Sequence, residues 1–370
     1  MDATSVVWAA TTLFNVTNVL MVYALLHIVC GLWCVFKPWY NRRHFQPSGK
    51  HVLITGGSSG LGRELAKELL CAGAVVTIVA RDKSNLRAAK SKLKTECGLR
   101  KHRIVPRPGS HSGAQKKPLF VYAADVTVFE QMEAAFAAAK AHHGGMSVNW
   151  VVCCAGKAVP GFLKDQSLSV FREQMDVNYI GSVNTVKAAL SHILPTTDLG
   201  AKAAFGAGDS RIVLVSSAMA HLSFAGYSQY AASKYAVRGF AEALRNELLP
   251  DNVAVHLYCP GNIQTPGFEM ETKIKPFVTH LIEGTSNPAS PKSAAKSLLE
   301  GMAAGQFNIT NEFPLRLLAV GTAGVAPRSC AYLDFLLWPL AFAAAFAFQK
   351  YMDYVVISER KKDQKHTVNH

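Results

Sequence analysis

The chain has 370 residues, of which 49% are hydrophobic, and this is enough apolar material for a large folded core. Its formal net charge of +14 would suit a nucleic-acid-binding protein. However, much of the positive charge lies in two segments, 100–117 and 359–365, without the interleaved aromatic residues of a nucleic-acid surface. The charge distribution therefore argues against nucleic acid as a partner.

The first hydrophobic segment runs from Val6 to Phe36 without an Asp, Glu, Lys or Arg. A helix needs about 20 such residues to cross a bilayer. The chain opens with Met1-Asp2 and offers no small-residue cleavage site after the segment, so we interpret it as a retained anchor rather than a signal peptide. A buried core helix is the alternative. By the positive-inside rule, the basic residues that follow place the body in the cytosol; they are Lys37, Arg42, Arg43 and Lys50.

The segment after the anchor has the order of a nucleotide-binding unit: strand, glycine loop, helix, strand. Residues 51–55 predict a strand, 63–73 an amphipathic helix that stops at a glycine, and 74–80 a second strand. Glycines let the backbone approach a pyrophosphate, and the helix start offers amide donors. On its own the pattern also fits an ordinary turn. The glycines of the loop are Gly56, Gly60 and Gly62.

The end of the second strand indicates which nucleotide binds. An NAD-specific protein usually has an acidic residue there, where this chain has Arg81. Since an arginine can pair with a 2′-phosphate, and Ser58 and Ser59 can add hydroxyl donors, we expect NADP(H). The alternative for Arg81 is a solvated charge at the strand end.

Two further strands are predicted at 121–126 and 148–156. Asp125 would end the first of these near the adenine, and Ala155 and Gly156 would end the second close to the cofactor. The segments 100–117 and 196–210 are rich in small and turn-forming residues, so we expect loops there.

Tyr230 and Lys234 lie four residues apart, and Ser217 lies 13 residues before the tyrosine. Residues four apart on a helix share a face, so both side chains can reach one cleft. The lysine would lower the pKa of the Tyr230 phenol, and the Ser217 hydroxyl would stabilise the oxygen of a reacting carbonyl. Ser216 competes with Ser217, but adjacent side chains at a strand end face opposite ways, and we prefer Ser217. The pattern predicts proton transfer beside hydride transfer.

Over roughly residues 50–300 the chain resembles the short-chain dehydrogenase/reductase family, in the runs TGGSSGLG, DVNYIGS, SS…YAASK and CPGNIQTPG. The resemblance implies an α/β fold: a Rossmann-like, doubly wound parallel sheet with helices on both faces. It implies that Tyr230 donates the proton, Lys234 holds the nicotinamide ribose, Ser217 orients the ketone and Asn178 holds a water in the proton relay. The cofactor-binding residues that it implies are Gly56, Ser58, Ser59, Gly60, Leu61, Gly62, Arg81, Asp125, Ala155, Gly156, Tyr230, Lys234, Pro260, Ile263 and Thr265.

One position departs from the family pattern. Cys153 stands where the family usually has an asparagine that braces the central sheet through its side chain. A thiol is a weak hydrogen-bonding group, so we expect a local structural change there. The chain's eight cysteines have no metal-ligand spacing, and we expect buried, reduced thiols and no metal site; they are Cys30, Cys34, Cys71, Cys97, Cys153, Cys154, Cys259 and Cys330.

A second hydrophobic region at 331–348 is less regular, because it contains Asp334 and Pro339. Basic residues also follow this region, so a single span would put one basic flank on the wrong side of the membrane. A re-entrant segment, or a hairpin with residues 315–326 as its partner, would keep both flanks in the cytosol. The path of this region therefore stays open.

Within the family the chain resembles the membrane-bound members that reduce 3-ketodihydrosphingosine to dihydrosphingosine with NADPH in sphingolipid metabolism. This rests on the runs YAASKYAVRGFAEALRNELLP, TPGF and GQFN and on the hydrophobic ends. It implies a long-chain lipid ketone as substrate, the endoplasmic reticulum membrane as location and a catalytic domain that faces the cytosol. Apolar residues after the nicotinamide loop are expected to form a lid, or else an ordinary core or membrane-contacting helix; they are Phe268, Met270, Phe277 and Leu281.

The expected organisation is an anchor (1–45), an NADP-binding reductase domain (46–312), a hydrophobic membrane region (313–357) and a basic tail (358–370). One alternative function is another membrane-bound reductase of the family, acting on retinoids, steroids or 3-ketoacyl thioesters. A non-catalytic lipid-binding scaffold is an alternative of another class. Family members often form dimers or tetramers, so a homo-oligomer also stays open.

Overall fold

The computed structural model describes residues 3–99, 117–194, 210–284, 287–328 and 330–368. Except for their last residues, Lys117 and Ser210, the two predicted loops lie outside these ranges. A parallel sheet of seven strands forms the centre, in the order β3-β2-β1-β4-β5-β6-β7. The strands are β1 (His51–Thr55), β2 (Val75–Ala80), β3 (Leu119–Ala123), β4 (Trp150–Cys153), β5 (Arg211–Val215), β6 (Ala254–Tyr258) and β7 (Asn308–Ile309).

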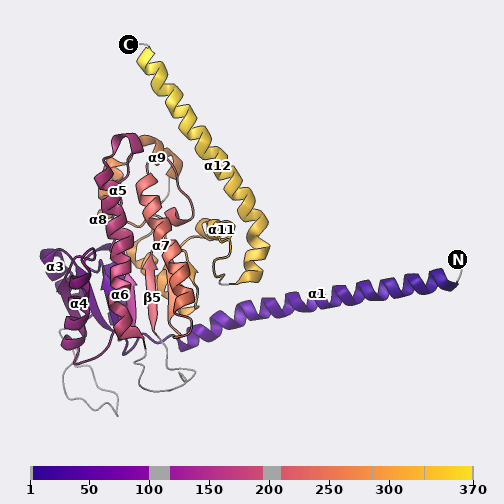
Figure 1. The fold of residues 1–370 in the computed structure, drawn as a ribbon, viewed down its shortest axis with the longest axis horizontal. Helices are drawn as coiled ribbons and strands as arrows, with labels where there is room; N and C mark the ends of the chain where they lie inside the picture. The colour runs from indigo at the N-terminus through magenta and orange to yellow at the C-terminus, as the bar shows by residue number, and fades with distance from the viewer. Residues whose placement is uncertain (1–2, 100–116, 195–209, 285–286, 329, 369–370) are drawn as a thin grey trace.

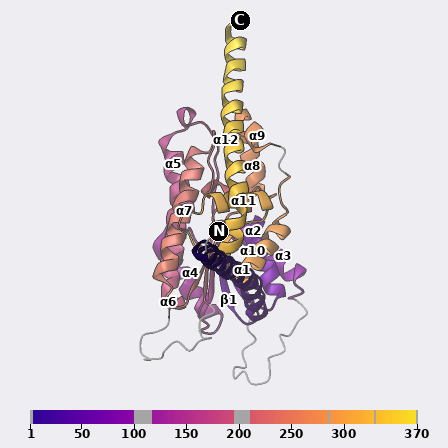
Figure 2. The ribbon, with the colours of Figure 1, turned by 90° about the vertical axis from the view of Figure 1, so that its right-hand side faces the viewer.

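Helices cover both faces of this sheet, which confirms the doubly wound fold (Figures 1 and 2). Strand β1 is buried along its whole length, and its side chains alternate between two cores: Leu53 enters one, and Val52 and Ile54 enter the other. The core with Leu53 includes side chains of α4 (Phe129–His142), α6 (Gly181–Ile193) and α7 (Ser228–Glu247). The other includes side chains of α2 (Gly60–Cys71), α3 (Lys83–Glu96) and α10 (Pro291–Ala303).

The remaining elements of the body are short. Segment α5 (Leu168–Met175) leads through a π-helical turn, η2 (Asp176–Ile180), directly into α6. After β6 come α8 (Pro266–Ile274) and α9 (Phe277–Glu283). Two 3₁₀ turns, η1 (Leu163–Asp165) and η3 (Ala218–Ala220), complete the set.

The hydrophobic ends form long helices, α1 (Ala3–His44) and α12 (Ala331–Val368), with the short α11 (Phe313–Gly321) between the body and α12. By length and composition, Met21–His44 and Ala331–Arg360 could each cross a membrane. Helix α12 continues through Pro339, which does not fit the re-entrant alternative for residues 331–348. Helix α11 packs against α12 through Leu317, Val320 and Ala341, as the hairpin alternative required. Its 9 residues span only about 14 Å, which is too short to cross a bilayer.

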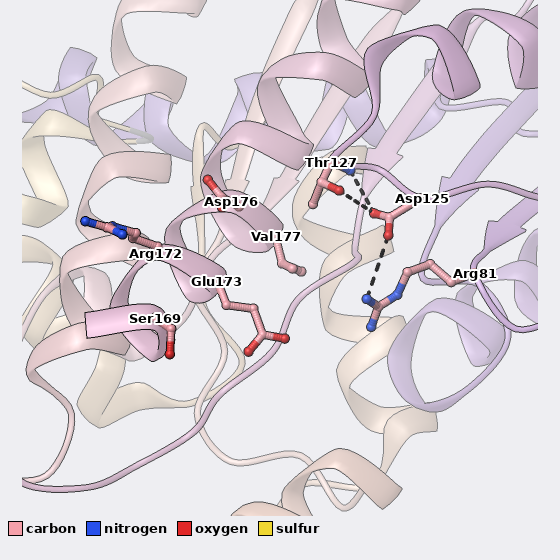
Figure 3. Close-up of a pocket in the computed structure, with 8 residues that line it drawn as sticks. All are labelled: Arg81, Asp125, Thr127, Ser169, Arg172, Glu173, Asp176 and Val177. Carbon is pink, nitrogen blue, oxygen red and sulfur yellow. Dashed lines mark hydrogen bonds and ion pairs between the residues drawn. The ribbon is translucent and has the colours of Figure 1, made fainter. Parts of the chain in front are cut away.

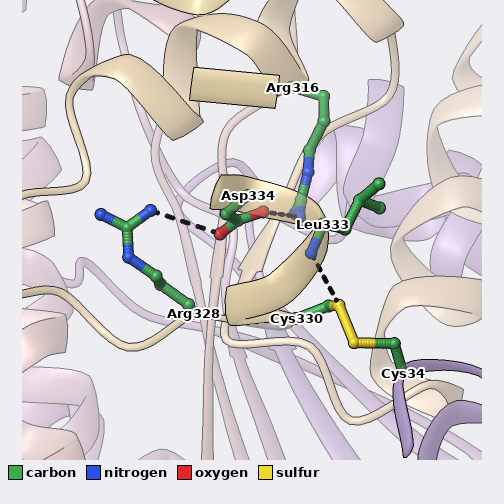
Figure 4. The surroundings of a disulfide bond; sticks show 6 residues. All are labelled: Cys34, Arg316, Arg328, Cys330, Leu333 and Asp334. Carbon is green, nitrogen blue, oxygen red and sulfur yellow. Dashed lines mark hydrogen bonds and ion pairs between the residues drawn. A yellow bond between two sulfur atoms is a disulfide. The ribbon is translucent and has the colours of Figure 1, made fainter. Parts of the chain in front are cut away.

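A disulfide joins Cys34 of α1 to Cys330 beside α12, so the expectation that all eight cysteines are reduced is wrong (Figure 4). The two cysteines are 296 residues apart, and they meet because α12 starts against the side of α1. Next to this link Asp334 forms ion pairs with Arg316 and, at 3.6 Å, with Arg328. Asp334, the acidic residue within the apolar segment 331–348, is therefore paired with positive charge.

His51 at the start of β1 is fully buried. Its Nδ1 lies 3.2 Å from the Met146 carbonyl oxygen and its Nε2 lies 3.0 Å from the Thr77 hydroxyl, which suits a neutral ring. Burial lowers the pKa of His51 from 6.5 to about 4. Between these values the unfolded chain binds a proton that the folded chain does not bind. The contribution of His51 to stability is therefore complete above pH 6.5 and is lost as the pH falls toward 4.

We expect His51→Gln to flatten the loss of stability on acidification. Between pH 7 and pH 5, the unsubstituted protein should lose about 2 kcal/mol more unfolding free energy than His51→Gln. Unfolding of the detergent-solubilised protein measured at both pH values would show it, with the exposed His44→Gln as the control. Equal losses in His51→Gln and the unsubstituted protein would contradict this role of His51.

Candidate active site

A cleft of about 690 Å³ gathers the residues expected to act in catalysis and cofactor binding. Loops that follow β1, β4, β5 and β6 line it, because parallel strands present their carboxyl ends at one edge of the sheet. Every predicted site residue except Asn178 lines the cleft. These are Gly56, Ser58, Ser59, Gly60, Leu61, Gly62, Arg81, Asp125, Ala155, Gly156, Ser217, Tyr230, Lys234, Pro260, Ile263 and Thr265.

Helix α7 carries Tyr230 and Lys234 on the face that meets the end of β5. The Lys234 ammonium lies 5.6 Å from the centre of the Tyr230 ring and donates to the Val215 carbonyl at 3.1 Å. The Ser217 hydroxyl is close enough to the Tyr230 phenol to favour its ionised form, and its oxygen accepts from the Met219 amide at 3.2 Å. By contrast, the Ser216 hydroxyl donates to the Lys234 carbonyl at 3.0 Å, so it holds α7 against β5. This geometry favours Ser217 over Ser216 as the serine that meets a substrate.

The two titratable groups of this trio are desolvated. Burial, followed by the negative charge of Glu271, raises the pKa of Tyr230, and the hydrogen bond from Ser217 opposes this rise. The net shift of the Tyr230 pKa is therefore upward, opposite to the lowering that Lys234 was expected to cause. Burial also lowers the pKa of Lys234, to about 8. At neutral pH the phenol keeps its proton, which is the form that a proton donor needs.

Asn178 lies behind the wall of the cleft, in η2. Its Oδ1 accepts from the Lys157 amide at 2.8 Å, and its Nδ2 donates to the Lys157 carbonyl at 3.0 Å and to the Ser233 hydroxyl at 2.8 Å. The side chain therefore ties the loop after β4 to α7. Its role in a water relay stays a prediction.

The glycine loop is folded too tightly for side chains at Gly56, Gly57, Gly60 and Gly62. A Cβ on Gly56, which has a φ of +67°, would lie 2.8 Å from the Ala155 amide nitrogen. A Cβ on Gly62 would lie 2.5 Å from the Gly56 carbonyl oxygen. The first residues of α2 also line the cleft, so helix-start amides and bare backbone face the same space. This cradle fits the pyrophosphate of a dinucleotide.

At the far end of the cleft Arg81 and Asp125 face each other, with 3.8 Å between Nη1 and Oδ2 (Figure 3). Asp125 also accepts from the amide and the hydroxyl of Thr127, at 2.9 and 2.8 Å, which fixes its carboxylate. The Arg81 side chain is 62% exposed, and such exposed ion pairs are weak. The guanidinium is thus free to turn toward a phosphate.

The sheet below the cleft is braced differently from the family pattern. Cys153 is buried, and its thiol makes a long contact of 3.9 Å with the Ser182 carbonyl. The Thr55 hydroxyl at the end of β1 accepts from the amides of Cys154 and Ala155, at 3.1 and 3.3 Å. Thr55 therefore connects β1 to the turn after β4, at the junction where Cys153 replaces the asparagine.

The end of the cleft near α8 and α9, called the substrate end below, contains three polar residues that the sequence analysis did not single out. They are Tyr227, Glu271 and Glu283. Of the four expected lid residues, Phe268 and Met270 line the cleft. Phe277 is exposed, and Leu281 accepts a hydrogen bond from Tyr351 of α12 through its carbonyl. One feature of the sequence could have pointed to this polar group: Glu271 lies three positions after Phe268, in a segment expected to form an apolar lid.

Known proteins that are similar to this chain indicate its family. The model of the short chain dehydrogenase family matches residues 50–275. A 3-ketodihydrosphingosine reductase of Dictyostelium discoideum is 28% identical over 93% of this chain and 98% of its own length. A protein of the same name from Bos taurus is 33% identical over 82% and 83%, and a 3-dehydrosphinganine reductase of Danio rerio is 31% identical over 83% and 85%.

The family match covers more than half of the chain and contains the glycine loop, Ser217, Tyr230 and Lys234. The fold places these features around one cleft. The chain belongs to the short-chain dehydrogenase family of oxidoreductases.

Proposed function

We propose that the protein reduces 3-ketodihydrosphingosine to dihydrosphingosine with NADPH at a membrane. One observation carries the proposal: Ser217, Tyr230 and Lys234 share a cleft with a dinucleotide cradle, in a chain whose relatives are named for this reaction. The family uses a nicotinamide cofactor, which supplies a hydride when bound. The side chains of this chain then have to orient the ketone and protonate its oxygen.

The geometry supports a division of these tasks between separate groups. In this proposal the Ser217 hydroxyl, which lies beside the Tyr230 phenol, binds the carbonyl oxygen of the ketone. The raised pKa of Tyr230 keeps its proton available until negative charge develops on that oxygen. Lys234 supplies a buried positive charge beside the phenol, which stabilises the phenolate left by the transfer.

The preference for NADPH rests on the residues after β2. Asp82, the acidic residue nearest to the strand end, caps α3: its carboxylate accepts from the Asn85 amide at 2.7 Å and from the Ser84 hydroxyl at 2.6 Å. Because the Asp82 carboxylate is engaged in this cap, Arg81 rather than Asp82 is available to bind the group at the 2′ position of the ribose. A guanidinium suits a 2′-phosphate better than a 2′-hydroxyl.

The membrane proposal rests on the terminal helices. Helix α1 projects from the body, and α12 lies along the body beside α11 and α9 (Figure 1). Many apolar side chains of α12 are exposed, among them Phe335, Trp338, Phe342 and Phe346. We propose that α1 anchors the reductase domain (46–312) in the endoplasmic reticulum membrane, with the domain on the cytosolic side. The exposed face of α12 would then contact lipid.

The direct test is a substrate panel with NADPH. Detergent-solubilised protein should reduce 3-ketodihydrosphingosine at least about 10-fold more efficiently, as kcat/KM, than a steroid ketone, retinal or a 3-ketoacyl thioester. NADPH consumption followed by absorbance measures this. Comparable rates on all four would leave a reductase without the proposed substrate, and reduction of none would favour a lipid-binding scaffold.

Tyr230→Phe should lower kcat about 100- to 10,000-fold, because it removes the proton donor and leaves the ring in place. Tyr235→Phe, on the solvent side of the same helix, is the matched control and should keep the original rate. A Tyr230→Phe protein with undiminished turnover would show that the chemistry lies elsewhere.

Arg81→Ala should weaken NADPH binding about 10- to 100-fold and leave NADH binding unchanged, because only NADPH has the 2′-phosphate. Fluorescence titration of both dinucleotides gives the two dissociation constants. Arg87→Ala, an exposed change on α3, serves as the control for charge. Equal weakening of the two dinucleotides by Arg81→Ala would refute the phosphate role.

A further inference from the structure

The substrate end of the cleft has an uneven set of charges on α8 and α9. The Lys275 ammonium lies 2.6 Å from Oε2 of Glu283 and 3.4 Å from Oε1 of Glu271. Two carboxylates therefore share one ammonium, which leaves one negative charge in the cluster. Both carboxylates line the cleft, whereas Lys275 is buried behind them, over the rings of Tyr227 and Phe268.

Glu271 is close to the reacting group. The Tyr227 hydroxyl hydrogen-bonds Glu271 and lies 3.0 Å from Glu283, and the ring of Tyr227 lies 5.8 Å from that of Tyr230. The charge of Glu271 is also a cause, after burial, of the raised pKa of Tyr230. The carboxylate and the catalytic phenol therefore act on the same part of the cleft.

The proposed substrate has a matching arrangement of groups. Its amino group is on the carbon next to the ketone, so whatever binds the ammonium must lie beside the group that protonates the ketone oxygen. We propose that Glu271 binds this ammonium and makes the enzyme selective for 2-amino ketones over ketones that lack the amine. This inference rests on the proposed function and adds a specificity-determining residue to it.

The surroundings of Glu271 support such a role. Burial raises the pKa of Glu271, as expected for a carboxylate with too little positive charge beside it. An incoming ammonium would supply that charge and would also offset the field that Glu271 exerts on Tyr230. The neighbouring cleft residues Met270 and Ile274 are apolar and exposed, which suits an alkyl chain leading away from the charged end. A ketone without the amine would leave this desolvated carboxylate with only the Lys275 ammonium that it shares with Glu283.

The experiment compares two substrates, 3-ketodihydrosphingosine and 1-hydroxyoctadecan-3-one, which lacks the amine. With NADPH, the unsubstituted protein should show at least about 10-fold higher kcat/KM for the amino ketone. Glu271→Gln keeps an oxygen for Tyr227 and removes the charge. It should lower kcat/KM for the amino ketone about 10- to 100-fold, mainly through KM, and should not lower the value for the deaminated ketone.

Glu269→Gln is the matched control, since it removes an exposed charge from the same helix, and both substrates should keep their rates. Equal losses on both substrates in Glu271→Gln would mean a structural role for the Tyr227–Glu271 contact, and no loss on either would mean no role. Both outcomes overturn the inference. If the unsubstituted protein reduces both ketones equally well, selectivity is refuted while the ketone reduction stands. If it reduces neither, the proposed function itself fails.

Discussion

All strand pairs of the sheet run parallel, and this constraint creates the site. Because the carboxyl ends of the strands lie on one edge, segments from 56 to 283 enter the same cleft. The contact between Gly56 and the Ala155 backbone closes the floor, and Thr55 braces it from the neighbouring position. A side chain at residue 56 would separate the glycine loop from the end of β4 and widen the cradle.

The cleft combines a dinucleotide cradle with a substrate end in which burial raises the free energy of charged side chains. Burial shifts the pKa of Tyr230 upward and that of Lys234 downward to about 8, because desolvation penalises the charged form of each group. Charge that arrives with cofactor and substrate, or that develops during reaction, therefore meets groups already held in place. The negative charge of Glu271 acts against phenolate formation at Tyr230, and a bound cation would offset it.

The sequence predicted most of the fold and nearly all of the cofactor end of the site. Strand and loop residues there, such as Gly56, Gly60 and Arg81, are recognisable because backbone conformation and strand position dictate their type. Glu271 was not recognisable. Its importance comes from contacts with Tyr227 and Lys275, and an acidic residue in a short helix is usually a solvated surface charge.

Local patterns in the sequence determined the succession of strands and helices along the chain, the glycine cradle, the Tyr230–Lys234 spacing and the apolar ends. The sequence already favoured Ser217 over Ser216, and the contact of Ser216 with Lys234 agrees with that choice. Tertiary structure alone decided in which direction burial moves the phenol pKa and that Cys34 meets Cys330. The physical reason is that periodicity and turn chemistry act between near neighbours. Desolvation, and a contact between residues 296 positions apart in the sequence, depend on tertiary packing, which a local sequence pattern does not predict.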